Sequence, residues 1–191
     1  MPGRPGKRVT MLLIIDVQND FFEPNGSLGV KGADDIVPVI NALRQFNFDM
    51  VVQAVDWHPY NHCSFSSNNP GAAKFSTISL PLAGPQTMWP DHCIQDTFGS
   101  AFHKDLVVKS TDIIVRAGIN PHSDSYSAFR DNIGQVKTPL LDIMLGEGVT
   151  HLFCVGLALD YCVQYTALDA KMQTGTCRCL SGAEQVTTPH R

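Results

Sequence analysis

Reactive side chains follow three of the four main apolar segments of the sequence. Asp16 follows the first segment, Asp56 and His58 follow the second, and Cys162 follows the fourth. If these segments are strands of an open parallel sheet, ligands bind just beyond their carboxyl ends. The spacing therefore predicts one reactive centre at one edge of a sheet.

Cys162 is the candidate nucleophile. It stands two residues after Asp160, which can cap a helix. The dipole and the free N–H groups at a helix N-terminus favour a thiolate and can also bind an oxyanion. A nearby carboxylate such as Asp16 could take the thiol proton. The alternatives are a buried cysteine that acts as a small hydrophobe, and an aspartate that caps a turn.

Histidines and a carboxylate form a candidate metal site. Asp56 and His58 are two residues apart on an extended segment, so their side chains point the same way and can meet one ion. His62 and His92 are further candidate ligands in the segment that follows. Mixed nitrogen and oxygen ligands fit zinc, iron or manganese. The alternative is a surface loop with incidental histidines.

The elements that must position these groups alternate between strands and helices. This alternation predicts an α/β domain with a mainly parallel sheet. Residues 57–111 are rich in Pro, Gly, Ser, Asn and His, and a loop of that length is usually functional. The predicted strands are 9–17, 50–55, 112–115, 151–157 and a short one at 176–180. The predicted helices cover 36–43 after a cap at Asp34, 140–145 after Thr138 and Pro139, and the residues that follow Asp160.

Composition limits the function classes. The 191 residues are 43% hydrophobic and 17% charged, which predicts one folded domain over residues 1–191. The net charge of -4 argues against a general nucleic-acid binder. The apolar runs are too short to span a membrane, and no secretory signal precedes Asp16. Six irregularly spaced cysteines favour a reduced protein and a cytoplasmic location.

Five sequence motifs, in unbroken order between Val9 and Ala170, closely resemble those of nicotinamidases. These enzymes are metal-dependent amidases of the isochorismatase-like hydrolase superfamily. Each motif alone is weak, but five in order are highly specific. The motifs are residues 16–21 with 26–28, residues 56–59 with His62, Ser64, Phe65 and Asn68, residues 88–95, residues 124–129, and residues 155–163.

The resemblance implies a three-layer fold, with helices on both faces of the sheet, and hydrolysis of nicotinamide to nicotinate and ammonia in NAD salvage. Cys162 would form a thioester and Asp16 would take its proton. A divalent metal, zinc first and iron or manganese as alternatives, would orient the substrate. The further implied residues are Asp56, His58, His92 and His62 for the metal, the N–H groups of Ala158 and Cys162 for the oxyanion after a cis Leu157–Ala158 bond, and Phe21, Trp89 and Tyr126 for the pyridine ring.

The sequence departs from the family pattern at three places. Ala117 stands where the family has a lysine that would pair with Asp16, and Leu159 stands where a small hydroxyl residue is usual. Residues 171–191 are divergent, which predicts a shortened C-terminal region and a partly uncovered sheet edge, and residues 1–8 are predicted to be flexible. Two other functions stay open: a catalytically silent member that binds metal and a pyridine ligand, and a related small-amide hydrolase. The sequence leaves a homo-oligomer open.

Overall fold

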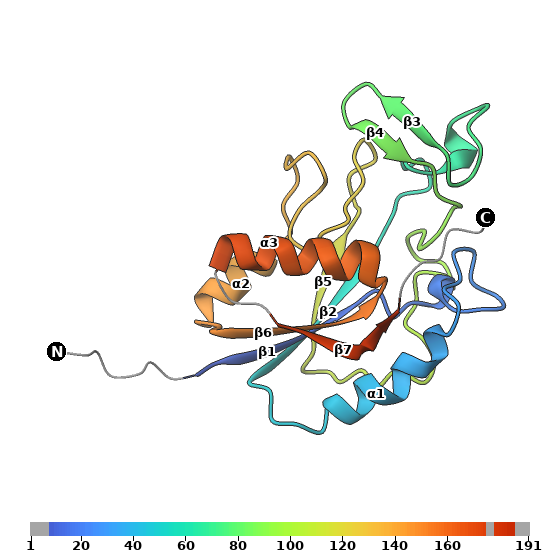
Figure 1. The fold of residues 1–191 in the computed structure, drawn as a ribbon. Coiled ribbons are helices and arrows are strands. Elements are labelled where there is room, and N and C mark those ends of the chain that lie inside the picture. Colours follow the sequence, from blue (N-terminus) through green and yellow to red (C-terminus); the bar gives the residue numbers. More distant parts are fainter. Residues whose placement is uncertain (1–7, 175–177, 186–191) are drawn as a thin grey trace.

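A five-stranded parallel sheet forms the centre of the computed structural model, which describes residues 8–174 and 178–185 (Figure 1). The strand order is β5-β2-β1-β6-β7, and every neighbouring pair is parallel. The strands are β1 (Thr10–Ile15), β2 (Met50–Asp56), β5 (Ile113–Ala117), β6 (His151–Leu157) and β7 (Arg178–Gln185).

The central strand β1 is buried on both faces, as its unbroken apolar sequence requires. Because side chains alternate along a strand, Leu12 and Ile14 pack into one core cluster, while Met11, Leu13 and Ile15 pack into a second cluster on the opposite face. The sheet therefore separates two cores, and each core needs its own cover of helices.

Helices cover both faces of the sheet. Helix α1 (Ile36–Leu43) buries Ile36, Val37 and Ile40 in the first core. Helices α2 (Leu140–Gly146) and α3 (Gln164–Thr174) lie on the other face, as Figure 1 shows. This arrangement confirms the predicted three-layer α/β fold.

The capping predictions were less successful. Asp34 does not cap α1: it lies in the 3₁₀ turn η2 (Ala33–Asp35), and its carboxylate is 3.5 Å from Nε2 of His103. Asp160 does not precede its helix either, because a π-helical turn, η4 (Leu159–Val163), begins directly after Ala158 and leads into α3.

The long segment after β2 is mostly irregular, as predicted, but it contains one hairpin that the sequence analysis missed. Its strands are β3 (Thr77–Leu80) and β4 (Gly84–Thr87), which pair antiparallel. Both strands are only four residues long and half-exposed, and β4 contains a proline. The sequence therefore has no apolar pattern that would predict them. Two further 3₁₀ turns are η1 (Asn19–Phe21) and η3 (Ser66–Asn68).

The last strand runs further than predicted. β7 extends to Gln185 and pairs with β6 across a register shift between Cys154 and Gly156. Helix α1 lies against β7, so this edge of the sheet has a neighbour on one face. The predicted flexibility of residues 1–7 and the predicted divergence of residues 186–191 concern residues outside those described. Among the described residues, none of the helices combines the length and the apolar character that crossing a bilayer would require.

Candidate active site

The predicted reactive residues gather at the carboxyl ends of the parallel strands. Asp16 follows β1 with a positive φ of 53°, and its N–H donates to the carbonyl oxygen of Ala54 at 3.0 Å. Its Oδ1 accepts the N–H of Asp56 at 3.1 Å. The ends of β1 and β2 are therefore joined, and two carboxylates are held side by side in a buried position.

Gln18 reinforces this junction, and the sequence analysis did not single it out. It is fully buried. Its Oε1 accepts the N–H of Asp56 at 2.9 Å, and its Nε2 donates to the carbonyl oxygens of Asp56 at 2.7 Å and Ser100 at 2.9 Å. The signal that the sequence offered was a glutamine two residues after Asp16.

Cys162 lies in η4, with its side chain close enough to Asp16 to share a hydrogen bond. One ligand atom each from Asp16, Asp56 and Cys162 lie within 4.8 Å of one another. Burial and the neighbouring carboxylates Asp16 and Asp56 raise the pKa of the Cys162 thiol well above its ordinary value. We predicted that the helix N-terminus would lower the pKa of the thiol. Burial and the nearby carboxylates have the opposite effect, and they are the larger influence.

Asp16 is affected in the same direction. Burial, followed by the charge of Asp56, raises the pKa of the Asp16 carboxyl well above its ordinary value. A carboxyl with a raised pKa is a stronger base once it is ionised, which suits it to taking a thiol proton. The charge of a nearby cation would favour both ionised forms.

The strand end at β5 supplies no such cation. Ala117 is buried, and its carbonyl oxygen accepts the N–H of Trp57 at 2.9 Å. Its neighbour Arg116 is exposed and stacks over the Trp57 ring at 4.6 Å from the ring centre. The guanidinium thus faces away from Asp16, as alternation along a strand requires.

The bond between Leu157 and Ala158 is cis, as the resemblance implied. Ala158 is buried and lines the same pocket as Cys162. The two residues therefore line one cavity, and their backbone N–H groups are candidates to bind developing negative charge there.

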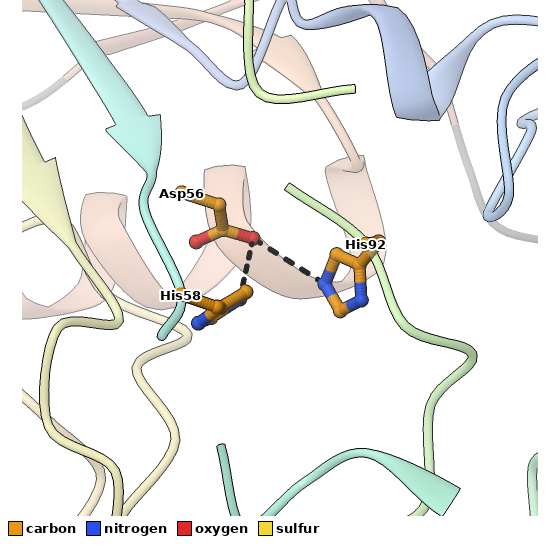
Figure 2. Close-up of side chains that lie close together, drawn as sticks. All are labelled: Asp56, His58 and His92. Atoms are coloured by element: carbon orange, nitrogen blue, oxygen red, sulfur yellow. Dashed lines mark ion pairs between the residues drawn. The ribbon is translucent and has the colours of Figure 1, made fainter. Parts of the chain in front are cut away.

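Asp56, His58 and His92 form the predicted metal-ligand cluster (Figure 2). Oδ2 of Asp56 is 3.4 Å from Nε2 of His58 and 3.6 Å from Nε2 of His92. Nδ1 of His58 donates to the carbonyl oxygen of Gly118 at 2.9 Å, and Nδ1 of His92 donates to that of Pro90 at 2.8 Å. These bonds fix the rings so that both Nε2 atoms face the carboxylate, as metal-binding histidines require.

His62 belongs to an adjacent group of possible ligands, in which atoms of His58, His62 and Asp124 lie within 4.8 Å of one another. Its Nδ1 is 2.8 Å from Oγ of Ser64, while its buried Nε2 has no hydrogen-bond partner. Burial, together with the charges of His58 and His92, lowers the pKa of His62 to about 2, so the ring is neutral. An unpaired buried nitrogen is costly in a dry site, and a metal ion would satisfy it. The residues present therefore fit a metal.

Charge balance at the cluster supports the same interpretation. Burial alone would lower the pKa of His58, but Asp56 outweighs it and raises this pKa to about 9. Burial alone would raise the pKa of Asp56, but His58 and His92 outweigh it and lower this pKa. A divalent cation would replace the proton on His58. Asp124, which the sequence analysis did not single out as a ligand, lies within reach of His58 and His62.

One pocket is lined both by Asp56 and His92 of the metal cluster and by Cys162. Phe21, Trp89 and Tyr126, the residues predicted to contact the ring, all line this pocket, and Nε1 of Trp89 donates to the Tyr126 hydroxyl at 3.3 Å. Tyr161 is a further aromatic wall that was not predicted, with its ring centre 5.0 Å from that of Trp89. The pocket suits a flat ring that carries one reactive substituent.

Comparison with known proteins agrees with this geometry. Residues 10–175 match the isochorismatase domain family. The chain is 44% identical to a nicotinamidase of Acinetobacter baylyi over 83% of this chain and 73% of that protein. It is 42% identical to a nicotinamidase of Escherichia coli over 83% of this chain and 75% of that protein.

Solved structures show the same likeness. A nicotinamidase/pyrazinamidase of Acinetobacter baumanii has a TM-score of 0.90 at 40% identity, over 97% of this chain and 88% of that one. A pyrazinamidase of Pyrococcus horikoshii in complex with zinc has a TM-score of 0.77 at 31% identity, over 94% of this chain and 88% of that one.

Proposed function

The chain belongs to the isochorismatase domain family, and on that premise we propose that it is an amidase that hydrolyses nicotinamide to nicotinate and ammonia. One observation carries the proposal. Cys162 and a histidine and carboxylate cluster that fits a metal open onto the same aromatic pocket. A single ring can therefore be held at one end while its carboxamide meets the thiol at the other.

Cys162 attacks the carboxamide carbon while Asp16 takes the thiol proton. The C–N bond then breaks, the proton passes to the leaving nitrogen, and ammonia departs to leave a nicotinoyl thioester on the sulfur. Asp16 next takes a proton from water, and the hydroxide displaces the Cys162 thiolate. The thiolate then regains that proton from Asp16, and the acid product leaves as nicotinate after it loses its own proton to the ammonia released. The backbone N–H groups of Ala158 and Cys162 hold the oxyanion in both steps.

Asp56, His58, His92 and His62 would hold a divalent ion, with zinc as the first choice and iron or manganese as alternatives. When bound, the ion supplies a Lewis acid that orients the pyridine nitrogen. The complex of the Pyrococcus horikoshii relative with zinc supports this choice. Phe21, Trp89 and Tyr126 stack on the ring and exclude water from the carboxamide.

Ala117 reduces the rate in this proposal. No cation at this position favours the thiolate or the Asp16 carboxylate, and the loss of one member of a catalytic group usually costs several orders of magnitude. A metal-binding but catalytically silent chain is the second candidate, and the raised pKa of Cys162 favours it. We also propose that the chain forms a single domain, that it acts in NAD salvage and that it is located in the cytoplasm.

Chromatographic measurement of nicotinate release tests the proposal. We expect the zinc-loaded protein to release nicotinate from nicotinamide, and the Cys162→Ala variant to lose this activity at unchanged zinc content. Cys63→Ala is the matched control, since Cys63 lies outside the pocket lining and should tolerate substitution. Equal release by the wild-type chain and Cys162→Ala would overturn the enzymatic proposal and leave the silent metal-binding chain.

A further inference from the structure

The carboxylate of Asp20 anchors the segment that carries the metal-ligand candidate His92. Its Oδ2 accepts the backbone N–H of Cys93 at 2.7 Å, and its Oδ1 accepts that of Ser27 at 3.3 Å. Asp20 and Cys93 are 73 positions apart in the sequence, so this bond joins η1 to a distant part of the chain. No step of the proposed hydrolysis uses the Asp20 side chain.

Cys93 has a backbone conformation that needs such an anchor. It is fully buried, and its φ of 46° lies in the left-handed region, which a residue with a Cβ adopts only at a cost. Cys93 directly follows His92, and its carbonyl oxygen accepts the N–H of His58 at 3.0 Å. The conformation of this one residue therefore places the backbones of both histidines.

Gly99 leaves room for the Asp20 carboxylate. A Cβ at residue 99 would lie 1.8 Å from Oδ2 of Asp20 and 2.3 Å from its Cγ. Gly99 does not have a positive φ, so an alanine could adopt its backbone conformation. The position of the Asp20 carboxylate, and not the backbone, therefore requires that residue 99 has no side chain.

We propose that Asp20 is a positioning residue for the metal site. It holds His58 and His92 in the arrangement that binds a divalent ion, and it acts through the backbone of Cys93. The hydrogen bond from His92 to the carbonyl oxygen of Pro90 lies within one segment, so it orients the ring but does not place the segment against His58. The inference rests on the proposed function for the presence of the metal.

Other hydrogen bonds hold the two sides of this segment. The N–H of Trp89 donates to the carbonyl oxygen of Ser64 at 2.8 Å, and the N–H of Gln95 donates to that of His58 at 2.9 Å. Loss of the Asp20 carboxylate should therefore loosen the segment between these bonds without unfolding the protein. Groups that position metal ligands commonly contribute 10–100-fold to metal affinity.

Competition with a chelator measures the effect on zinc binding. Asp20→Ala should lower zinc affinity about tenfold. Asp20→Asn should keep most of the affinity, because its amide oxygen can accept the Cys93 N–H. Asp49→Ala is the matched control and should leave zinc affinity unchanged. Asp49 accepts the N–H of Thr10 at 2.8 Å just before β2 begins, at the end of that strand opposite Asp56.

Two further measurements separate positioning from stability. In the metal-free protein, Asp20→Ala and Asp49→Ala should each lower the Tm by about 2–4 °C. In the cobalt(II)-loaded protein, only Asp20→Ala should shift the visible ligand-field bands, because these bands depend on the arrangement of ligands around the ion. A purely structural role of Asp20 would lower the Tm and leave the bands unchanged.

Gly99→Ala tests the same contact without a change at Asp20. The added methyl group displaces the carboxylate, so zinc affinity should again fall about tenfold. In the Asp20→Ala background, Gly99→Ala should cause no further loss, since the two substitutions remove one interaction. Circular dichroism verifies that each variant is folded, and Gly99→Ala keeps the inference testable if Asp20→Ala does not fold.

The possible failures are separable. The expected zinc and cobalt results without nicotinate release keep the role of Asp20 and reject the nicotinamidase. Nicotinate release by the wild type, with unchanged zinc affinity and cobalt bands in Asp20→Ala, rejects the role of Asp20 alone. A loss in Asp20→Asn as large as in Asp20→Ala, or additive losses in the double variant with Gly99→Ala, would also overturn it. A wild-type chain that binds neither ion would overturn both proposals.

Discussion

The two ends of the pocket differ in how completely they are built. At the metal end, hydrogen bonds from Nδ1 to carbonyl oxygens orient His58 and His92, and the ring of His62, whose Nε2 has no hydrogen-bond partner, lies 4.3 Å from the ring of His58 between their centres. At the nucleophile end, Asp16 and Cys162 share a buried space with Ala117 and with no described cationic side chain. The comparison indicates that substrate binding and substrate cleavage are separable in this chain.

The largest expected effect comes from the addition of a cationic side chain at the nucleophile end of the pocket. Ala117→Lys places an amine at the cavity beside Asp16 and Cys162, so the thiolate gains a partner. We expect the kcat for nicotinate release to rise about a hundredfold, with little change in zinc affinity. Ala117→Met is the matched control, because it fills a similar volume without charge.

An unchanged rate in Ala117→Lys, with normal folding and zinc content, would show that the missing cation is not the cause of a slow nucleophile end. A rate gain in Ala117→Met of the same size would show that volume rather than charge was missing. Either result would remove the contrast between the two ends.

The second largest expected effect is a loss of zinc affinity at the metal end of the pocket. His62→Ala removes the unpaired Nε2 donor, and we expect zinc affinity to fall about 10–100-fold in competition with a chelator. His151→Ala is the matched control, since His151 begins β6 at the opposite end of the strand and contacts Thr150. Equal zinc affinities in the two variants would exclude His62 as a ligand.

The pH dependence of zinc binding follows from His58. Because Asp56 outweighs burial and raises its pKa to about 9, the metal-free ring is protonated at neutral pH. Zinc must displace that proton, so apparent zinc affinity should rise about tenfold per pH unit up to about pH 9 and then level off. Calorimetry in buffers of different ionisation enthalpy should detect the released proton. A flat profile between pH 7 and pH 9 would contradict the assignment of His58.

The smallest effect concerns one glycine. Gly118 has a φ of 68°, and a Cβ there would lie 2.3 Å from Cε1 of His58. Gly84 has a φ of 69° with open space around it. Substitution by alanine should cost each about 1–2 kcal/mol in unfolding free energy from the backbone. Only Gly118→Ala should also lower zinc affinity, and an equal loss in Gly84→Ala would contradict the packing argument.

The sequence predicted the layers, and it located four residues at or after the ends of strands, for a simple physical reason. Buried parallel strands are continuous apolar runs, so their ends, and with them Asp16, Asp56, Ala117 and Cys162, can be located by counting. Hydrogen bonds across the fold cannot be counted in this way.

The features that were missed depend on contacts between distant residues. The role of Gln18 arises from its bonds to Asp56 and Ser100. Tyr161 reaches the pocket only because η4 turns it toward Trp89. The raised pKa of the Cys162 thiol depends on burial, which local helix geometry does not reveal. These three features therefore depend on packing between residues far apart in the sequence, which the spacing of residues along the chain does not predict.

Calorimetric titration of nicotinamide tests the central contrast most directly. The Cys162→Ala chain should bind nicotinamide when it is loaded with zinc, as tightly as the same chain with an added Ala117→Lys substitution. Removal of zinc should abolish binding in both. Equal binding with and without zinc, or binding that depends on residue 117, would contradict the separation of a complete metal end from an incomplete nucleophile end.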